Sequence, residues 1–381
     1  MSVLKSATKL PRRVRQLRKA ARIAQKTVLV GTGLGVGLTA VSYAARRARR
    51  IDLLGKVVVI TGGSRGLGLA LAEECAAQGA NVAICARDRG ELDAAQQQIQ
   101  RKFGVEVLAE VCDVTNNDDV EEFLTAVLSR FGQIDVLINN AGIISVGPLE
   151  SQTLTEYQEA MDVMYWGVVY PTLTLLPHMK ARRSGRIANV ASIGGKISVP
   201  HLVPYSAAKF AAVGFSEGLR SELLKDGIKV TTICPGLMRT GSHLNAFFKG
   251  KHRSEFTWFS FGATMPLVSI DAHRAARKII DAVRHGDPEL IITPQAKLGI
   301  WLHGLFPGIT TNALGIMNRL LPNSDTSDRH ERYSGHESEN RLTRSFLQHF
   351  GRKAAHELNQ TPANKLTRDE TDRRWQSDVS A

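Results

Sequence analysis

From Lys56 onward, short runs of β-branched and other apolar residues alternate with longer amphipathic stretches. Near-continuous apolar strands separated by helices are typical of a parallel sheet that is covered on both faces. The pattern therefore predicts an α/β fold, a doubly wound, Rossmann-like parallel sheet in one domain over about 51–295. The predicted strands are 56–61, 81–86, 105–111, 134–139, 185–190, 229–234 and 289–293, and the predicted helices are 67–79, 90–103, 116–131, 154–183, 203–225 and 271–285.

The C-terminal part of the sequence divides into an apolar and a polar segment. Residues 296–322 are apolar and interrupted by proline. They fit either a last packed helix pair or a surface that touches lipid or a partner. After Pro322 the chain is polar and charged, which predicts a mostly disordered tail over 323–381 with a helix near 338–358.

The positive charge of the chain is concentrated at its N-terminus. The whole sequence has 49 Lys and Arg against 36 Asp and Glu, a formal charge of +13. Residues 1–50 hold 13 of these basic residues and no acidic one, so the remainder is neutral overall. A basic arm rather than a basic folded surface argues against nucleic-acid binding, and we expect no nucleic-acid partner.

The N-terminal arm also contains 19 residues without a charge, 27–45. This length is just sufficient to span a bilayer, although its four glycines make it only marginally apolar. A membrane anchor, a cleaved or mitochondrial targeting segment and a peripheral basic arm on anionic lipid are three alternatives. We expect membrane association through residues 1–50, with the catalytic domain in a reducing compartment on the cytoplasmic side and mitochondrial targeting as the alternative. Membrane orientation stays open, because basic clusters flank both ends.

The four cysteines, Cys75, Cys85, Cys112 and Cys234, are isolated in the sequence. Their spacing does not resemble a zinc site or a disulfide framework, so we expect small buried side chains and no metal.

The first predicted strand runs directly into a glycine-rich turn, TGGSRGLG, and then into a helix. Glycines there allow a tight turn and let the backbone approach a pyrophosphate at the helix N-terminus. Without a GK[ST] motif, the turn does not indicate a P-loop NTPase. We expect cofactor contacts from Thr61, Gly62, Ser64, Arg65, Gly66, Leu67 and Gly68.

The end of the second strand indicates which cofactor binds. An NAD-selective site places a carboxylate there to accept a hydrogen bond from the ribose. This sequence instead has the neutral Ala86 followed by Arg87, with Arg65 in the nearby turn. Two guanidinium groups suit a 2′-phosphate, so we expect NADP(H) rather than NAD.

Six ordered motifs make the sequence resemble the short-chain dehydrogenase/reductase family over about residues 55–295. They are TGGSRGLG (61–68), Asp113 after the third strand, NNAG (139–142), Ser192 after the fifth strand, YSAAK (205–209) and PGLMRT (235–240).

The resemblance implies roles for individual residues. Asp113 would contact the adenine ring. Tyr205 would be the general acid/base, Lys209 its activator, Ser192 the group that holds the substrate oxygen, and Thr240 a contact to the nicotinamide carboxamide. The remaining implied cofactor contacts are Asn139, Ala141, Gly142, Pro235 and Gly236. The family also pairs through the helices that correspond to 154–183 and 203–225, which implies a homo-oligomer.

The chemistry of Tyr205 and Lys209 can also be argued from the residues. Hydride transfer to a carbonyl leaves an alkoxide that needs a proton from a nearby acid. An i, i+4 spacing puts the phenol and the ammonium on one helix face. The ammonium, together with an oxidised nicotinamide, favours the phenolate and thereby lowers the pKa of the phenol.

One position departs from the family pattern. Met164 stands three residues before Gly167, where the family carries an Asn that helps to hold a water relaying protons to the lysine. A thioether cannot donate a hydrogen bond. This motivates an alternative function, a catalytically weak NADP(H)-binding sensor or scaffold.

The segment 241–265 corresponds to the lid of the substrate site in this family. Its apolar residues predict a lipid-like carbonyl or alcohol substrate. They argue against a nucleotide-sugar substrate, although membrane contact would give the same composition. The residues of this predicted wall are Leu244, Phe247, Phe248, Phe256, Trp258, Phe259 and Phe261.

Overall fold

The computed structural model describes residues 41–265, 269–324, 329–340, 343 and 354–360. The chain forms two compact units, Met1–Arg50 and Ile51–Ala381. In the first unit, residues 41–48 are helical, and most of the segment 27–45 lies outside the described residues. None of the helices within the described ranges has both the length and the apolar character needed to cross a bilayer.

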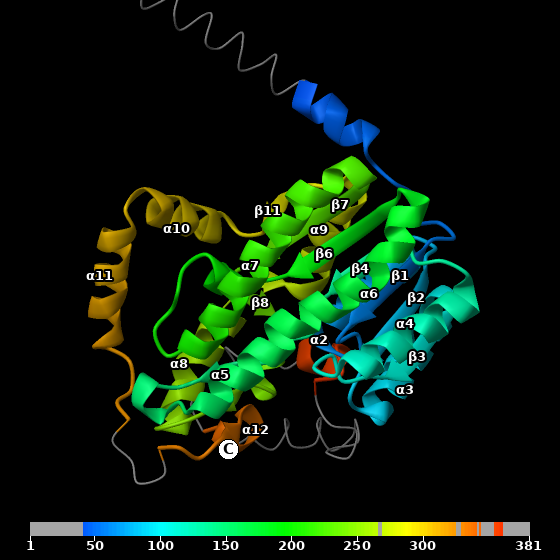
Figure 1. The fold of residues 1–381 in the computed structure, drawn as a ribbon. Coiled ribbons are helices and arrows are strands. Elements are labelled where there is room, and N and C mark those ends of the chain that lie inside the picture. Colours follow the sequence, from blue (N-terminus) through cyan, green and yellow to red (C-terminus); the bar gives the residue numbers. More distant parts are fainter. Residues whose placement is uncertain (1–40, 266–268, 325–328, 341–342, 344–353, 361–381) are drawn as a thin grey trace, which may run out of the picture. The chain divides into compact units, whose positions relative to one another are not determined.

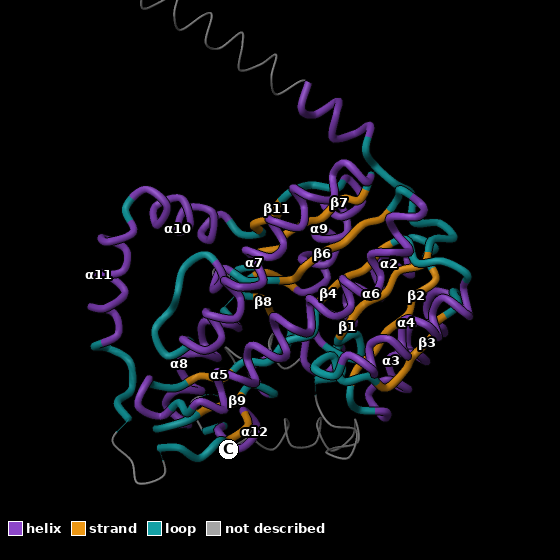
Figure 2. The backbone as a smooth tube through the Cα atoms, viewed as in Figure 1, coloured by secondary structure: helices purple, strands orange, loops and turns teal. Residues whose placement is uncertain are grey.

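The second unit is built on a seven-stranded sheet in the order β11-β7-β6-β4-β1-β2-β3 (Figure 2). All neighbouring strands are parallel, and Ile60 of β1 lies between Ile84 of β2 and Ile138 of β4. The predicted Rossmann-like sheet is therefore confirmed. The strands are β1 (Val57–Thr61), β2 (Asn81–Ala86), β3 (Val107–Val111), β4 (Val136–Asn139), β6 (Gly185–Val190), β7 (Ile228–Cys234) and β11 (Glu289–Ile291).

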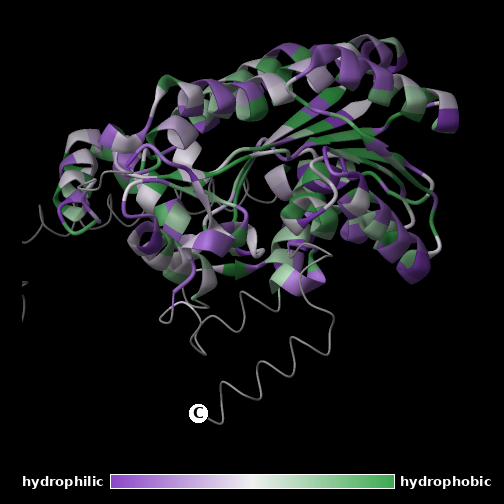
Figure 3. Cartoon of the chain, turned by 90° about the horizontal axis from the view of Figure 1, so that it is seen from below, coloured by the Kyte–Doolittle hydropathy of each residue, from purple (hydrophilic) through white to green (hydrophobic). Residues whose placement is uncertain are grey.

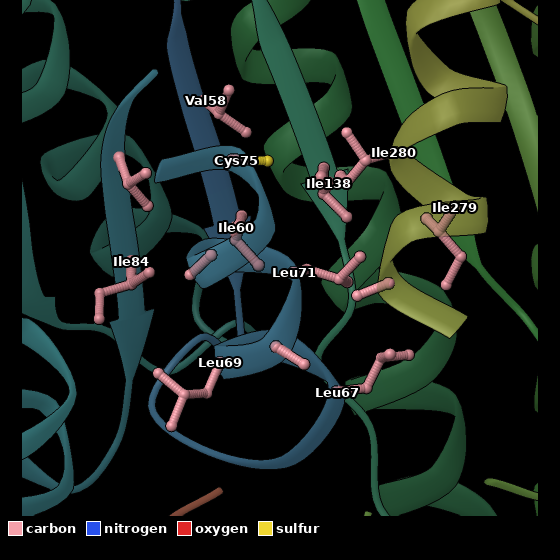
Figure 4. Packing of buried hydrophobic residues seen from close by; sticks show 14 of the residues in the cluster. Val58, Ile60, Leu67, Leu69, Leu71, Cys75, Ile84, Ile138, Ile279 and Ile280 are labelled. Carbon is pink, nitrogen blue, oxygen red and sulfur yellow. The ribbon is translucent and has the colours of Figure 1, made fainter. Parts of the chain in front are cut away.

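Helices cover both faces of this sheet (Figure 1). One hydrophobic cluster joins the sheet to α2 (Gly66–Ala77), α3 (Arg89–Phe103) and α9 (Ala272–His285). Figure 4 shows Leu69 and Leu71 of α2 in this cluster with Ile60 of β1 and Ile279 of α9. The second cluster joins the other face to α4 (Asn117–Phe131), α6 (Gly167–Arg182) and α7 (Val203–Leu223).

The strands of the sheet are hydrophobic along most of their length (Figure 3), because both of their faces are buried. The four cysteines are all free and buried, as the sequence predicts.

The predicted helix over 154–183 is not continuous. It consists of α5 (Leu154–Met161), a π-helical turn (Asp162–Trp166) and α6. Pro171 and Pro177 both lie inside α6. Pro171 cannot donate to the carbonyl of Gly167, and the wider turn lies directly N-terminal to that weakened position. Met164 lies in the middle of this turn and is fully buried.

Shorter elements build the region beside the carboxyl ends of the strands. Its helices are α8 (His252–Thr264), α10 (Pro294–Leu305), α11 (Pro307–Asn318) and α12 (Gly335–Ser338). Its strands are β5 (Ser145–Val146), β8 (Met238–Arg239), β9 (Phe247–Phe248), β10 (Ile270–Asp271) and β12 (Tyr333–Ser334). Single 3-10 turns cover Leu149–Ser151, Ile193–Gly195, Leu224–Asp226 and Ser242–Leu244.

The described parts of the polar tail pack onto the second unit. Strand β12 pairs with β9 in antiparallel orientation, and Ala355 and Leu358 are buried in the hydrophobic clusters. Residues 335–338 and 354–357 are helical, whereas 344–353 of the predicted helix near 338–358 lie outside the described residues.

Candidate active site

A cleft of about 730 Å³ opens at the carboxyl ends of the strands. The loops after β1, β2, β4, β6 and β7 all contribute to it, through Gly62, Arg87, Gly142, Ser192 and Pro235. The strand order reverses at β1, which has β2 on one side and β4 on the other. Ligands of open α/β sheets bind at such a switch point.

Two glycines of the turn after β1 are required by close packing. Gly62 has φ +64°, and a Cβ there would lie 2.9 Å from Cα of Ala141. A Cβ on Gly68 would lie 1.9 Å from the carbonyl oxygen of Gly62. A side chain at either position would displace the start of α2 from the cleft wall.

Thr61 and Asn139, two predicted cofactor contacts, are buried and do not line the cleft. Thr61 Oγ1 accepts hydrogen bonds from the backbone N–H groups of Asn140 and Ala141, at 3.0 and 3.2 Å. Asn139 Nδ2 donates to Thr172 Oγ1 and Asn189 Oδ1, at 3.0 and 2.8 Å. Both residues tie neighbouring strands together behind the wall.

Asn140, which the sequence analysis did not single out, lines the cleft. Its Nδ2 donates to the carbonyl oxygens of Thr61 and Gly62, at 3.1 and 3.0 Å. The other predicted contacts of the glycine-rich turn and of β4 also line the cleft: Ser64, Arg65, Gly66, Leu67, Ala141 and Gly142.

Ser192, Tyr205 and Lys209 line the same cleft. Ser192 follows β6, and its Oγ accepts a hydrogen bond of 3.0 Å from the backbone N–H of Gly194. Tyr205 lies in the first turn of α7, and Lys209 lies one turn later with its Nζ 6.0 Å from the centre of the Tyr205 ring. The structure thus brings Ser192, which follows β6, into one cleft with Tyr205 and Lys209 of α7.

The electrostatic surroundings of Tyr205 differ from the expectation. Burial raises the pKa of the phenol above its usual value, and the hydrogen bond with Ser192 only partly opposes this rise. Burial also lowers the pKa of Lys209 to about 8. The spacing of Lys209 predicts that its ammonium favours the phenolate, whereas in the protein alone desolvation penalises the charged forms of both residues.

The end of the cleft near β2 contains an acidic group that the sequence analysis missed. Glu91 in the first turn of α3 accepts a hydrogen bond of 2.8 Å from the Arg65 guanidinium and one of 2.9 Å from the Ser64 hydroxyl. Arg87 is exposed and lines the cleft, as does Glu91. The sequence signal was present: Asp88 caps α3 by accepting from the backbone N–H of Glu91, a spacing typical of a helix start.

Asp113 lines the cleft after β3, as predicted for an adenine contact. Its Oδ1 accepts from the backbone N–H and the hydroxyl of Thr115, at 3.0 and 2.9 Å, so its carboxylate is held in place.

Pro235, Gly236 and Thr240 line the other end of the cleft. The carbonyl of Pro235 accepts a 2.8 Å hydrogen bond from the backbone N–H of Ile193. This bond fixes the loop after β7 against the turn that carries Ser192.

The predicted aromatic wall is mostly wrong. Of its seven residues, only Trp258 and Phe259 line the cleft. Leu244, Phe248 and Phe256 are instead buried in a hydrophobic cluster that also contains Phe259. Aromatic content in the sequence could not separate a wall from a core, because both require the same residues.

Other apolar residues also line the cleft: Ile143, Ile144, Val163, Val199, Leu202 and Leu237. Trp258 is held by a buried polar pair. Its Nε1 donates a 2.7 Å hydrogen bond to Glu255, and Glu255 is joined to His201 by a hydrogen bond of 2.9 Å.

The C-terminal residues 358–360 also reach the cleft, which no sequence pattern indicated. The backbone N–H of Gly66 donates a 2.8 Å hydrogen bond to the carbonyl of Leu358. Asn359 Nδ2 donates a 3.3 Å hydrogen bond to the carbonyl of Ser64. Gln360 lines the cleft beside Gly66.

The glycine-rich turn follows the first strand of a parallel sheet and shares a cleft with Ser192, Tyr205 and Lys209. This combination defines a Rossmann-like protein of the dehydrogenase type. A family model for short chain dehydrogenases matches residues 56–247. A dehydrogenase/reductase SDR family protein 7-like of Anopheles gambiae is 33% identical over 288 residues, which cover 73% of this chain and 87% of that protein. The chain therefore belongs to the short-chain dehydrogenase family, a family of oxidoreductases.

Solved structures agree with this assignment. L-sorbose reductase from Gluconobacter frateurii, complexed with NADPH and L-sorbose, has a TM-score of 0.57 and 29% identity, covering 64% of this chain and 97% of that chain. A short-chain dehydrogenase/reductase from Burkholderia phymatum in complex with NAD has a TM-score of 0.62 at 24% identity, covering 68% and 96%, a likeness that shows the fold.

Proposed function

We propose that this protein is an NADP(H)-dependent oxidoreductase that interconverts a carbonyl and an alcohol on a hydrophobic substrate. The observation that carries the proposal is the position of Ser192, Tyr205 and Lys209 in one cleft with the glycine-rich turn. Family membership supports the same class of reaction.

The residues of the cleft fit a nicotinamide dinucleotide. Gly62 and Gly68 keep the wall of the cleft clear where a Cβ would clash with backbone. Leu67 and Gly68 in the first turn of α2 would hold the pyrophosphate, Asp113 the adenine, and Thr240 the carboxamide. When bound, the nicotinamide supplies or accepts the hydride.

The chain's own residues manage the proton. In the direction of reduction, Tyr205 donates the proton of its phenol to the substrate oxygen, and its raised pKa keeps that proton in place beforehand. Ser192 hydrogen-bonds the same oxygen and fixes its position. Lys209, buried one helical turn from Tyr205, positions positive charge beneath the site.

Preference for NADP(H) is supported by Arg87 at the cleft and by Arg65, although Arg65 is paired with Glu91. A hydrophobic substrate is supported by the apolar side chains around Tyr205, including Leu202, Leu237 and Phe259.

The second candidate function is an NADP(H)-binding sensor with weak turnover. The buried Met164 favours it, because Met164 belongs to the hydrophobic cluster against which Tyr205 packs, where a hydrogen-bonding relay would need a polar group.

Two properties beyond the reaction are also proposed. Residues 1–50, acid-free and basic, would associate with membranes, and a high-salt wash of membranes would separate an anchor, which resists it, from a peripheral arm, which is released. The catalytic unit would form a homo-oligomer through α5–α6 and α7.

The experiment that tests the function is a screen of NADPH oxidation by the full-length protein against retinoid, steroid, fatty-aldehyde and quinone carbonyls. The proposal expects turnover with at least one class and loss of it in Tyr205→Phe. Cofactor binding without turnover in any class, unchanged by Tyr205→Phe, would establish the sensor instead.

A further inference from the structure

The helical hairpin formed by α10 and α11 concentrates exposed apolar side chains. Nine of the twenty large apolar side chains that are exposed among the described residues lie within 298–320. Helix α11 has no buried residue at all, and α10 buries only Ala296. Figure 1 shows the two helices beyond the edge strand β11, away from the helices that cover the sheet.

The exposed apolar residues are spaced as one face of each helix. On α10 they are Leu298, Trp301, Leu302 and Leu305, an i, i+3, i+4, i+7 pattern. This spacing normally marks the face that a helix buries against a protein core. Here Trp301 is 62% exposed and Leu298 58%.

The same pattern continues along α11. Ile309 is 68% exposed, Ile316 is 65% exposed, and Leu320, just beyond the helix, is 84% exposed. One polar pair lies between the helices: His303 of α10 and Thr310 of α11 are joined by a 2.7 Å hydrogen bond. The hairpin therefore has a polar link between its helices and a large exposed apolar surface.

The charge of the hairpin indicates what covers it. Residues 290–324 contain no Asp or Glu, and their only Lys and Arg are Lys297 and Arg319. Residues 1–50 are also free of acidic residues. Tryptophan and long basic side chains favour the boundary between lipid headgroups and acyl chains, and acid-free segments suit an anionic surface.

We propose that α10 and α11 dock on the surface of an anionic phospholipid bilayer, with the apolar faces of both helices inserted among the acyl chains and without spanning it. This inference does not depend on catalysis. The hairpin is connected directly to the cleft, because the first turn of α10 supplies Gln295 and Ala296 to the cleft wall.

The test follows Trp301 in the full-length protein, mixed with phosphatidylcholine vesicles that contain 30% phosphatidylserine and carry bromine atoms on the acyl chains. Bromine quenches only tryptophans that lie among the acyl chains. We expect quenching in the wild type and its loss in the conservative variant Trp301→Phe, which leaves Trp166, Trp258 and Trp375 as internal references.

A triple variant, Ile309→Asn, Ile316→Asn and Leu320→Asn, should weaken vesicle binding about 10- to 100-fold, because three apolar side chains leave the lipid. Leu154→Asn is the matched control, since Leu154 is 83% exposed on a different helix and should bind as the wild type does. Binding is measured by vesicle flotation, and folding by thermal unfolding.

Two results would overturn the proposal. One is equal quenching of the wild type and Trp301→Phe, which would place Trp301 outside the lipid. The other is an unquenched Trp301 together with a wild-type oligomer, seen in sedimentation, that the triple variant no longer forms. That result would mean that a second copy of the chain covers the apolar faces of α10 and α11. Neither result depends on enzymatic activity, so the proposed function is tested separately.

Discussion

The ammonium group of Lys209 donates a 2.8 Å hydrogen bond to the backbone carbonyl of Val190, the last residue of β6. The bond joins α7, which carries Tyr205, to the strand that leads into Ser192. It also holds a buried cation against a neutral oxygen, so the positive charge is only partly compensated.

This arrangement predicts a pH dependence of stability. Burial lowers the pKa of Lys209 from 10.5 to about 8. Between these two values the unfolded chain binds the proton and the folded chain does not, so this residue makes the free energy of unfolding rise with pH. The full effect is about 3 kcal/mol, reached near pH 10.5 and absent below pH 8.

Urea unfolding between pH 7 and 10.5 measures it. Lys209→Met should lack the rise and should be inactive, whereas Lys225→Met, at a side chain that is 77% exposed, should follow the wild-type curve. Parallel curves for the wild type and Lys209→Met would contradict the argument.

Met164 gives a prediction that separates stability from proton supply. Met164→Leu conserves volume and should cost less than about 1.5 kcal/mol, with no change in rate. Met164→Asn buries an amide in the hydrophobic cluster that Tyr205 packs against and should cost about 1–3 kcal/mol unless the amide finds a partner.

If proton supply to Lys209 limits turnover, Met164→Asn should also raise kcat without changing the affinity for NADPH. An unchanged kcat in a folded Met164→Asn variant would mean that the methionine does not restrict the relay.

Glu91 predicts the balance between the two cofactors. Its carboxylate holds Arg65 and faces the end of the cleft where a 2′-phosphate would bind. Glu91→Gln should raise the affinity for NADPH relative to NADH by about tenfold, and Arg87→Asp should reverse or abolish the preference. Titration calorimetry with both cofactors measures the ratio, and equal binding of NADPH and NADH by the wild type would refute the assignment.

The glycine-rich turn predicts a contrast between two glycine substitutions. Gly68→Ala places a Cβ 1.9 Å from the carbonyl of Gly62, so it should destabilise by about 1–3 kcal/mol and weaken cofactor binding. Gly214→Ala, in α7 with no atom within 4 Å of the new Cβ, should stabilise by up to about 1 kcal/mol. Thermal unfolding of both variants checks the pair, and similar losses in both would show that packing at the turn is not the cause.

The fold was predictable because the strands are buried on both faces, which leaves continuous apolar runs such as 57–60 in the sequence. The cleft was predictable where motifs are local, as at Gly62–Gly68 and Tyr205–Lys209. The first segment lies at the end of a strand and the second on one face of a helix, so their places in the sequence already indicate that they face the cleft.

Contacts between distant segments were not predictable in the same way. Glu91 reaches Arg65 across 26 positions, and Leu358 reaches Gly66 from the polar tail. The prediction that the aromatic residues of the lid line the cleft was wrong for a different reason. Phe248 and Phe256 pack against each other, and the amino-acid composition of a core matches that of a cleft wall. The π-helical turn at Met164 left no pattern, because its residues are compatible with an ordinary helix.

The central claim is that Tyr205 delivers the proton in a hydride transfer from NADPH to a carbonyl carbon. The most direct measurement uses NADPH with deuterium at both C4 positions of the nicotinamide and follows the product by mass spectrometry, with the carbonyl class that the screen identifies. The wild type should transfer one deuterium to the former carbonyl carbon, while Tyr205→Phe should transfer it about 100- to 10,000-fold more slowly with NADPH affinity nearly unchanged. Equal transfer rates in the wild type and Tyr205→Phe, or an alcohol product without deuterium, would contradict the account.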